Sequence, residues 1–268
     1  MIKQATDYIK MKINGAIPKI GIVLGSGLGS LAQLIQSPIT IPYEDIPGFV
    51  KSTADGHKGN LIIGILSGKK VIIMQGRFHY YEGYSMQQIT FPIRVMKVLG
   101  VEFLLVTNAS GSLNQNYSLG DLVVLSNHIN MMPNPLIGPN MDDFGPRFLD
   151  ITLPYNRTLI QKAYYAAEQM QINLKQGVYI AVTGPSYETQ AEYSFYQKTG
   201  ADVIGMSTVG EVIVAKHCSM DVLGLSVVTS NSHDNPDSFS VDSGEVLQAA
   251  DEAAAKVNVL FSELVKLI

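Results

Sequence analysis

The chain has 268 residues, 46% of them hydrophobic and 16% charged, and its formal net charge is −4. This composition excludes a disordered chain and allows a large core, while the lack of any Lys/Arg-rich run argues against nucleic acid as a partner. The single cysteine, Cys218, excludes an intrachain disulfide and favours a reducing, cytoplasmic location. No apolar run reaches membrane-spanning length, so we expect no membrane contact.

Strand-like apolar runs alternate with helical patterns along the chain. We predict strands at residues 19–24, 61–66, 70–74, 103–107, 122–125, 178–182, 203–204 and 223–228. We predict helices at residues 28–36, 86–99, 157–170, 190–198, 209–218 and 243–265. The alternation predicts a single α/β domain over residues 1–268, with a mixed, mostly parallel twisted sheet flanked by helices. In such sheets ligands bind at the carboxyl ends of strands.

The first predicted strand ends in a glycine-rich turn, residues 25–30. Glycines let backbone N–H groups crowd an anion, and a helix beginning there adds its partial positive charge. Ser26 adds a hydroxyl donor, whereas Ser30 replaces the third glycine of a dinucleotide-binding fingerprint. The turn is therefore either an anion site or a tight structural connection. His57 lies in a second glycine-flanked loop, either as a surface residue or as part of a site.

The most informative segment is residues 75–84, Gln-Gly-Arg-Phe-His-Tyr-Tyr-Glu-Gly-Tyr, which follows the predicted strand 70–74. Residues two apart on a strand point the same way, so Arg77 and His79 are predicted to converge on one point. Two such donors suit a small oxyanion such as phosphate. The alternative is a solvated arginine and a histidine packed beside core aromatics.

Three later segments also follow predicted strands. Residues 107–112 are small and polar, and they form either a structural turn or a ligand-facing backbone. Glu188 either caps the next helix or accepts a hydrogen bond from a heterocycle N–H, with Tyr187 stacking on the ring. Ser207 is either another helix cap or a further hydroxyl for the anion.

The region from residue 127 to residue 150 is rich in proline and asparagine and has little periodicity, as is typical of functional loops. None of the serines discussed lies in a Gly-x-Ser-x-Gly elbow, which argues against a hydrolase triad. The five histidines show no metal-ligand spacing and there is no cysteine cluster, so we expect no metal site.

Taken together, five segments resemble the trimeric purine nucleoside phosphorylases, a family that also includes the methylthioadenosine phosphorylases. The segments are residues 25–29, 75–83, 107–109, 184–188 and 205–209. The resemblance implies a phosphorylase/hydrolase-like α/β fold and a homotrimer. It implies a pentosyltransferase that uses phosphate to cleave inosine- or guanosine-type nucleosides into purine base and (deoxy)ribose 1-phosphate. It also implies no cofactor, since inorganic phosphate is a co-substrate.

The resemblance further implies roles for individual residues. The expected phosphate ligands are Ser26, His57, Arg77, His79, Ala109 through its backbone, and Ser207. The expected nucleoside contacts are Tyr81 and Met206 at the ribose, Tyr187, Glu188 and Ile204 at the purine, Ser230 or Asn231 also at the purine, Ser243 near the 5′ group, and Phe144 from a neighbouring subunit. Among these residues His79, Glu188 and Asn231 are expected to be catalytic.

The chain departs from the family pattern at the purine and at the 5′ group. An asparagine that binds the purine in the family aligns with Ser230, so either Asn231 takes its role through a register shift or the contact differs. A family histidine near the 5′-hydroxyl aligns with Ser243. Glu188 favours 6-oxopurines; methylthioadenosine, adenosine or xanthosine phosphorolysis, and a catalytically silent nucleoside-binding protein, are the alternatives. His233 or Asp234 either enters the base site or belongs to a solvated turn.

Overall fold

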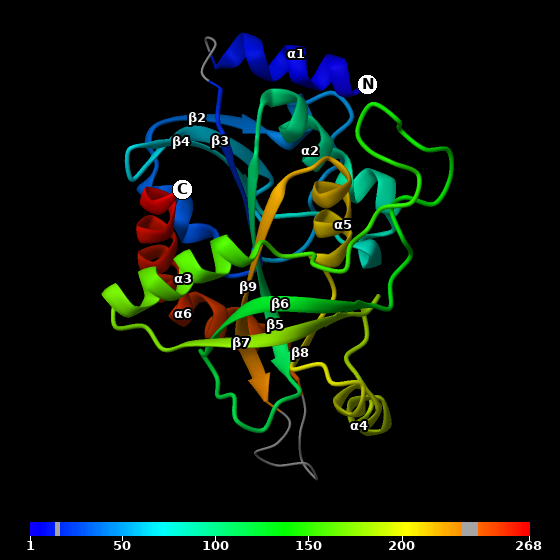
Figure 1. Ribbon diagram of the computed structural model, residues 1–268, viewed down its shortest axis with the longest axis vertical. Coiled ribbons are helices and arrows are strands. Elements are labelled where there is room, and N and C mark those ends of the chain that lie inside the picture. Colours follow the sequence, from blue (N-terminus) through cyan, green and yellow to red (C-terminus); the bar gives the residue numbers. More distant parts are fainter. Residues whose placement is uncertain (14–16, 232–240) are drawn as a thin grey trace.

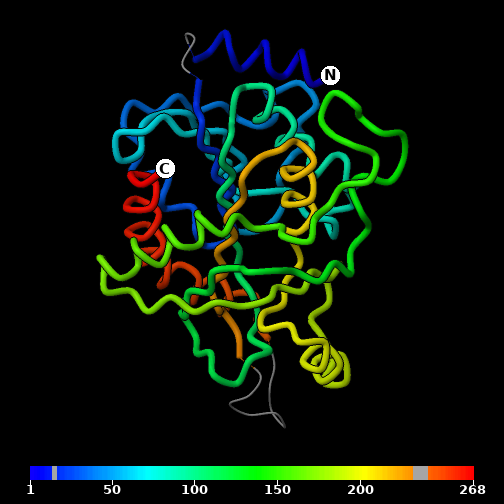
Figure 2. Tube along the Cα trace, in the orientation of Figure 1, coloured from blue at the N-terminus to red at the C-terminus, as the bar shows by residue number. Residues whose placement is uncertain are grey.

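The computed structural model describes residues 1–13, 17–231 and 241–268 (Figures 1 and 2). The strands are β1 Ile20–Leu24, β2 Gln36–Pro42, β3 Asn60–Leu66, β4 Lys69–Gln75, β5 Phe103–Ser112, β6 Leu122–Asn130, β7 Leu174–Ala181, β8 Val203–Gly205 and β9 Asp221–Asn231. The helices are α1 Ile2–Lys12, α2 Met86–Leu99, α3 Arg157–Gln169, α4 Gln190–Lys198, α5 Val209–His217 and α6 Ser243–Leu267, with short 3-10 helices η1 Gly29–Leu34, η2 Tyr43–Asp45 and η3 Tyr80–Glu82.

These strands form one sheet in the order β2-β3-β4-β1-β5-β8-β7-β6-β9, and β9 pairs back onto β5 (Figure 1). The last five strands therefore close into a ring. Pairings are parallel for β1–β4, β1–β5, β5–β9, β6–β7 and β7–β8, and antiparallel for β2–β3, β3–β4, β5–β8 and β6–β9. The predicted mixed α/β sheet flanked by helices is thus confirmed.

Hydrophobic cores lie on both faces of the sheet. One contains Ile9 of α1, Ile93 of α2 and Val212 of α5. The other contains Ala163 of α3 and Leu260 of α6. Every residue of β1 is buried between them, which explains why its sequence reads as a continuous apolar run rather than an alternating one.

The prediction of a helix at residues 28–36 is wrong. The 3-10 helix η1 ends at Leu34, and residues 36–42 form strand β2 against β3. Pro38 and Pro42 explain the difference, because proline disrupts a helix interior but is tolerated in an edge strand.

Two strands are longer than predicted, and both extensions concern polar residues. Strand β5 runs through Ser112, so residues 107–112 are strand rather than a turn. Strand β9 runs to Asn231 beside it, with Thr229 as an extra residue between the paired positions. Because β5 and β9 pair with each other, their polar ends are strand rather than loop.

The predicted irregular region begins after β6, and residues 131–156 contain neither helix nor strand. This loop projects from the molecule in green at the upper right of Figure 2. Among the described helices, none is both long and apolar enough to cross a membrane.

Strand β1 approaches β5 so closely at Gly25 that a larger residue has no room. A Cβ there would lie 2.9 Å from Cα of Asn108 and 3.0 Å from the carbonyl oxygen of Thr107. We expect Gly25→Ala to lower the free energy of unfolding by about 1–3 kcal/mol in urea titrations, because neither backbone atom can rotate away. Gly29→Ala is the matched control, since its Cβ would meet its nearest neighbour at 3.8 Å. An equal loss of unfolding free energy in the two variants would contradict the close contact between Gly25 and β5.

Candidate active site

Most of the predicted site residues line one cavity at the ends of β1, β5, β8 and β9. They are Ser26, Arg77, His79, Tyr81, Ala109, Tyr187, Glu188, Ile204, Met206, Ser207 and Ser230. The segments that carry them are far apart in sequence, so only the sheet brings them together.

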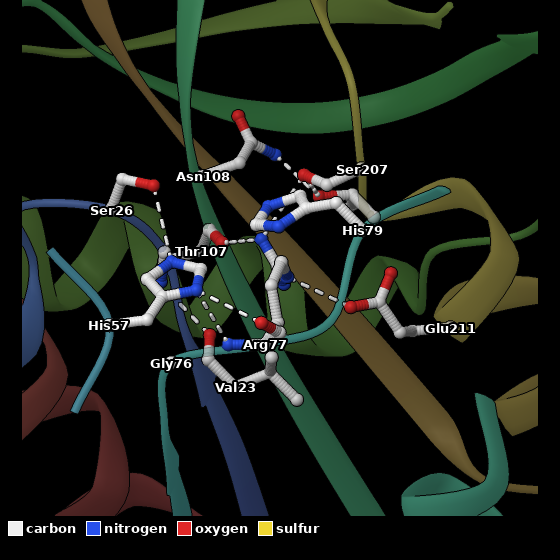
Figure 3. Close-up of polar contacts among 12 residues, drawn as sticks. Val23, Ser26, His57, Gly76, Arg77, His79, Thr107, Asn108, Ser207 and Glu211 are labelled. Atoms are coloured by element: carbon white, nitrogen blue, oxygen red, sulfur yellow. Dashed lines mark hydrogen bonds and ion pairs between the residues drawn. The ribbon is translucent and has the colours of Figure 1, made fainter. Parts of the chain in front are cut away.

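Arg77 lies at one end of this cavity and is 1% exposed. Its Nε donates to Glu211 Oε1 at 2.8 Å, and its Nη1 donates to the carbonyl oxygen of Thr107 at 2.5 Å and to Ser207 Oγ at 3.2 Å (Figure 3). Its buried Nη2 has no hydrogen-bond partner among the described residues. A buried donor left unpaired is costly, and an oxyanion in the cavity would supply the missing acceptor.

We predicted that Arg77 and His79 converge because they lie two residues apart on a strand, and that reason is wrong. Strand β4 ends at Gln75, and both residues follow Gly76, whose φ of +105° breaks the strand. Glycine is required here, because a Cβ would lie 2.6 Å from Cβ of His57. The two side chains nevertheless line the same cavity.

A chain of polar groups leads to Ser207 from the sheet interior. Ser226 Oγ donates to Asn108 Oδ1, and Asn108 Nδ2 donates to Thr208 Oγ1 at 2.9 Å. Since Thr208 Oγ1 accepts from Asn108, its own hydroxyl can donate to Ser207 Oγ at 3.2 Å. Ser207 then accepts from both Thr208 and Arg77 and keeps its hydroxyl proton for a ligand in the cavity.

The backbone at Thr208 is strained, with φ +72° and ψ −55°. Val209 N–H donates to the carbonyl oxygen of Ser207 at 2.8 Å, so the turn is a γ-turn of the rare positive-φ kind. A β-branched residue in this conformation persists only where its surroundings hold it. Here the fully buried Thr208 side chain is fixed by Asn108, and the turn presents Ser207 to the cavity.

His57 acts beside the cavity rather than in its lining. Its Nε2 lies 3.1 Å from Ser26 Oγ, and its Nδ1 lies 3.1 Å from the backbone nitrogen of Arg77 (Figure 3). Burial, together with the nearby His79 and Arg77, lowers the pKa of His57 to about 3. The ring is therefore neutral at neutral pH and holds Ser26 in place.

His79 is oriented by Glu82 and by ring stacking. Its Nδ1 lies 3.0 Å from Glu82 Oε1, and its ring stacks between His57 at 5.0 Å and Tyr81 at 4.7 Å. Burial acts to raise the pKa of Glu82, but hydrogen bonds from His79 and Thr53 outweigh it and lower that pKa to about 2. The ionised carboxylate therefore stabilises the proton on Nδ1 and fixes the direction of the ring.

The opposite end of the cavity suits a flat ring. Gly111 is part of the lining, and a Cβ there would lie 3.1 Å from Ser230 Oγ and 3.2 Å from Cγ2 of Ile204. Glu188 also lines the cavity, and burial raises the pKa of its carboxyl group. A planar group with an edge N–H would match this combination.

Four of the predicted residues lie outside the lining. His57 is described above. Asn231 Nδ2 donates to the carbonyl oxygen of Tyr117 at 3.4 Å, so Ser230, and not Asn231, reaches the cavity. Ser243 is exposed in the first turn of α6, and Phe144 packs on Arg94 at 5.1 Å in a separate groove. The role expected for Asn231 stays a prediction, and His233 and Asp234 lie outside the described residues.

The sequence assigned no individual role to five residues that the structure places at or beside the cavity: Thr107, Asn108, Tyr193, Thr208 and Glu211. Three of them lie in segments that the sequence analysis singled out, residues 107–112 and 205–209. Glu211 carried a signal of its own, as the single charge in the otherwise apolar run from Val209 to Ala215. In the described part of the chain, no group of three or more His, Cys, Asp or Glu side chains could hold a metal ion.

Comparisons with known proteins agree with this geometry. The Phosphorylase superfamily model matches residues 19–266. Purine nucleoside phosphorylase 1 of Bacillus subtilis (strain 168) is 50% identical over 271 aligned positions, covering 100% of this chain and 97% of the relative. The Bos taurus purine nucleoside phosphorylase is 44% identical, covering 92% of this chain and 88% of its own.

A solved structure is also similar over the whole chain. Schistosoma mansoni purine nucleoside phosphorylase in complex with inosine superposes with a TM-score of 0.94 at 40% identity, covering 100% of this chain and 96% of that one. The chain therefore belongs to the phosphorylase superfamily and, within it, to the purine nucleoside phosphorylases.

Proposed function

We propose that this chain cleaves purine nucleosides with inorganic phosphate, giving the free base and a pentose 1-phosphate, and that it needs no metal or organic cofactor. The observation that carries the proposal is the buried guanidinium of Arg77. One of its nitrogens has no hydrogen-bond partner in the described part of the chain, and Arg77 lines the same cavity as Ser207 and Glu188. Relatives in this family have been solved with inosine, guanosine and ribose 1-phosphate.

The chemistry follows from where the charges lie. Breaking the glycosidic bond builds positive charge on the sugar and negative charge on the leaving purine. A phosphate held by Arg77, Ser207 and Ser26 acts as nucleophile and as countercharge for the sugar. Glu188 accepts from the N1–H of a 6-oxopurine at the other end. Groups matched to separated charges bind the transition state more tightly than the ground state.

The reaction is tested directly by incubating the protein with nucleosides, with and without phosphate. We expect base release from inosine and guanosine only when phosphate is present, followed by absorbance and by detection of ribose 1-phosphate. Adenosine, xanthosine and methylthioadenosine are the comparison substrates. Base release without phosphate would replace phosphorolysis by hydrolysis, and no release from any nucleoside would favour a silent binding protein.

Glu188 is proposed to select the purine. Its ionised form accepts from the N1–H of inosine, whereas adenine N1 carries no proton and needs a donor. Burial raises the pKa of Glu188 above the ordinary 4.5, so its acid form becomes populated at a higher pH than usual. A relative has been solved with adenosine, which keeps adenosine as the second candidate substrate.

The ratio of kcat/KM for inosine to kcat/KM for adenosine therefore depends on pH. We expect the ratio to fall as the pH is lowered towards the pKa of Glu188, because protonation converts an acceptor into a donor. Ionisation of phosphate cancels in this ratio. In Glu188→Gln the amide both accepts and donates, so the ratio should be smaller and independent of pH. The same pH dependence in both proteins would remove Glu188 from base selection.

We also propose a cytoplasmic homotrimer in which each subunit lends Phe144 to a neighbouring cavity. Phe144 is held away from the cavity of its own chain by Arg94, and His217 Nε2 lies 3.2 Å from the carbonyl oxygen of Pro146. Arg147 Nη1 donates to the carbonyl oxygens of Leu136 and Gly138 at 3.0 and 2.8 Å. The loop is thus an ordered structure able to present a side chain outwards.

Mixing two damaged proteins tests this arrangement. We expect Phe144→Ala and Glu188→Ala each to lower activity about tenfold or more, by loss of one substrate contact. Subunits refolded together should regain part of the activity, because some cavities then combine an intact Glu188 with a Phe144 from a neighbour. Light scattering gives the subunit number. A mixture no more active than the sum of its parts would place Phe144 outside the neighbouring cavity.

A further inference from the structure

We propose that Glu211 is the permanent counter-ion of Arg77, that it fixes the position of the guanidinium, and that it limits how tightly the cavity binds phosphate. This inference rests on the proposed function, which puts phosphate at Arg77. It assigns a positioning role to Glu211, which does not line the cavity itself.

The first step is the burial of the ion pair. Arg77 Nε and Glu211 Oε1 are 2.8 Å apart, and the two side chains are 1% and 5% exposed. A buried guanidinium with no counter-ion is strongly destabilising. The only carboxylate that forms an ion pair with Arg77 in the described part of the chain is Glu211, so Glu211 compensates the buried positive charge.

The second step is geometric. Arg77 Nε donates a hydrogen bond to Glu211, and Arg77 Nη1 donates hydrogen bonds to the carbonyl oxygen of Thr107 and to Ser207 Oγ. These three acceptors use the N–H group of Nε and both N–H groups of Nη1, so among the described residues only Nη2 is left without an acceptor. An arginine held in this way offers phosphate one pre-oriented nitrogen, with two N–H groups, rather than the two nitrogens of a bidentate contact.

The third step is electrostatic. The charge of Arg77 is already shared with Glu211, so phosphate competes with a carboxylate for the same cation. Weaker binding of phosphate also means weaker binding of a sugar phosphate product, which must leave for the next turnover. The ion pair therefore lowers the affinity for phosphate and speeds the release of the sugar phosphate.

The fourth step concerns the helix that carries Glu211. Glu211 lies in the first turn of α5, where the positive end of the helix dipole stabilises its charge. The same helix starts directly after Ser207 and Thr208, and Ser207 N–H donates to Tyr179 Oη at 3.3 Å. One short segment thus supplies both a hydroxyl for the anion and the counter-ion that competes with it.

Glu211→Gln separates these two roles. The amide oxygen still accepts from Arg77 Nε, but the negative charge is gone. We expect phosphate to bind about tenfold more tightly by calorimetry, because it then becomes the counter-ion of Arg77. We also expect the KM for phosphate and kcat both to fall, because product leaves more slowly. Glu211→Ala loses the position as well, and we expect about tenfold weaker phosphate binding in that variant.

Thermal unfolding provides a second readout that does not require activity. Saturating phosphate should raise the Tm of Glu211→Gln by more than it raises that of the wild type, since phosphate replaces a missing charge. Glu263→Gln removes a carboxylate that is paired with Lys266 near the end of α6, and should leave the phosphate response unchanged.

The outcomes are distinguishable from failure of the proposed function. Phosphate binding that is unchanged or weaker in Glu211→Gln, or a Tm that phosphate raises no more than in the wild type, overturns the counter-ion role even if the enzyme cleaves nucleosides. If Glu211→Gln binds phosphate more tightly than the wild type but the wild type releases no base, the counter-ion role is supported and the proposed reaction is overturned.

Discussion

The arrangement of the cavity depends on one buried cation. Arg77 is 1% exposed and is held by Glu211 at the start of α5, by the backbone of Thr107 on β5, and by Ser207 on the turn between β8 and α5. A charge removed from water needs compensation from every side. The start of α5, strand β5 and the turn after β8 each supply a partner for this charge, and the sheet order places them around Arg77.

The two ends of the cavity are built differently. The anion end consists of strand ends, a γ-turn and a helix start, cross-linked by the polar chain from Ser226 through Asn108 to Thr208. At the purine end, Tyr187 and Glu188 come from the connection between β7 and α4, and Ser230 comes from the end of β9. Buried hydrogen-bond networks rigidify a site, so this polar chain fixes the turn that carries Ser207 at the anion end.

Much of the site was predictable because its motifs follow apolar strands, and parallel strands bring their carboxyl ends to one edge. Ser26, Ala109, Glu188 and Ser207 were found in this way, and all four line the cavity. The edge strand β2 was not found, because a short apolar run with prolines has no clear period. Tyr193 gave no signal either, since an aromatic residue on a helix is ordinarily core.

The sequence by itself determined the class of fold, the family, and which polar residues stand at strand ends, because these depend on local pattern and on short motifs. Tertiary structure alone decided that Arg77 pairs with Glu211 across 134 positions, that Ser230 rather than Asn231 reaches the cavity, and that His57 acts through Ser26. Pairing across such distances depends on strand order, on a one-residue bulge and on a glycine turn, and these are set by packing of the whole chain rather than by any segment of it.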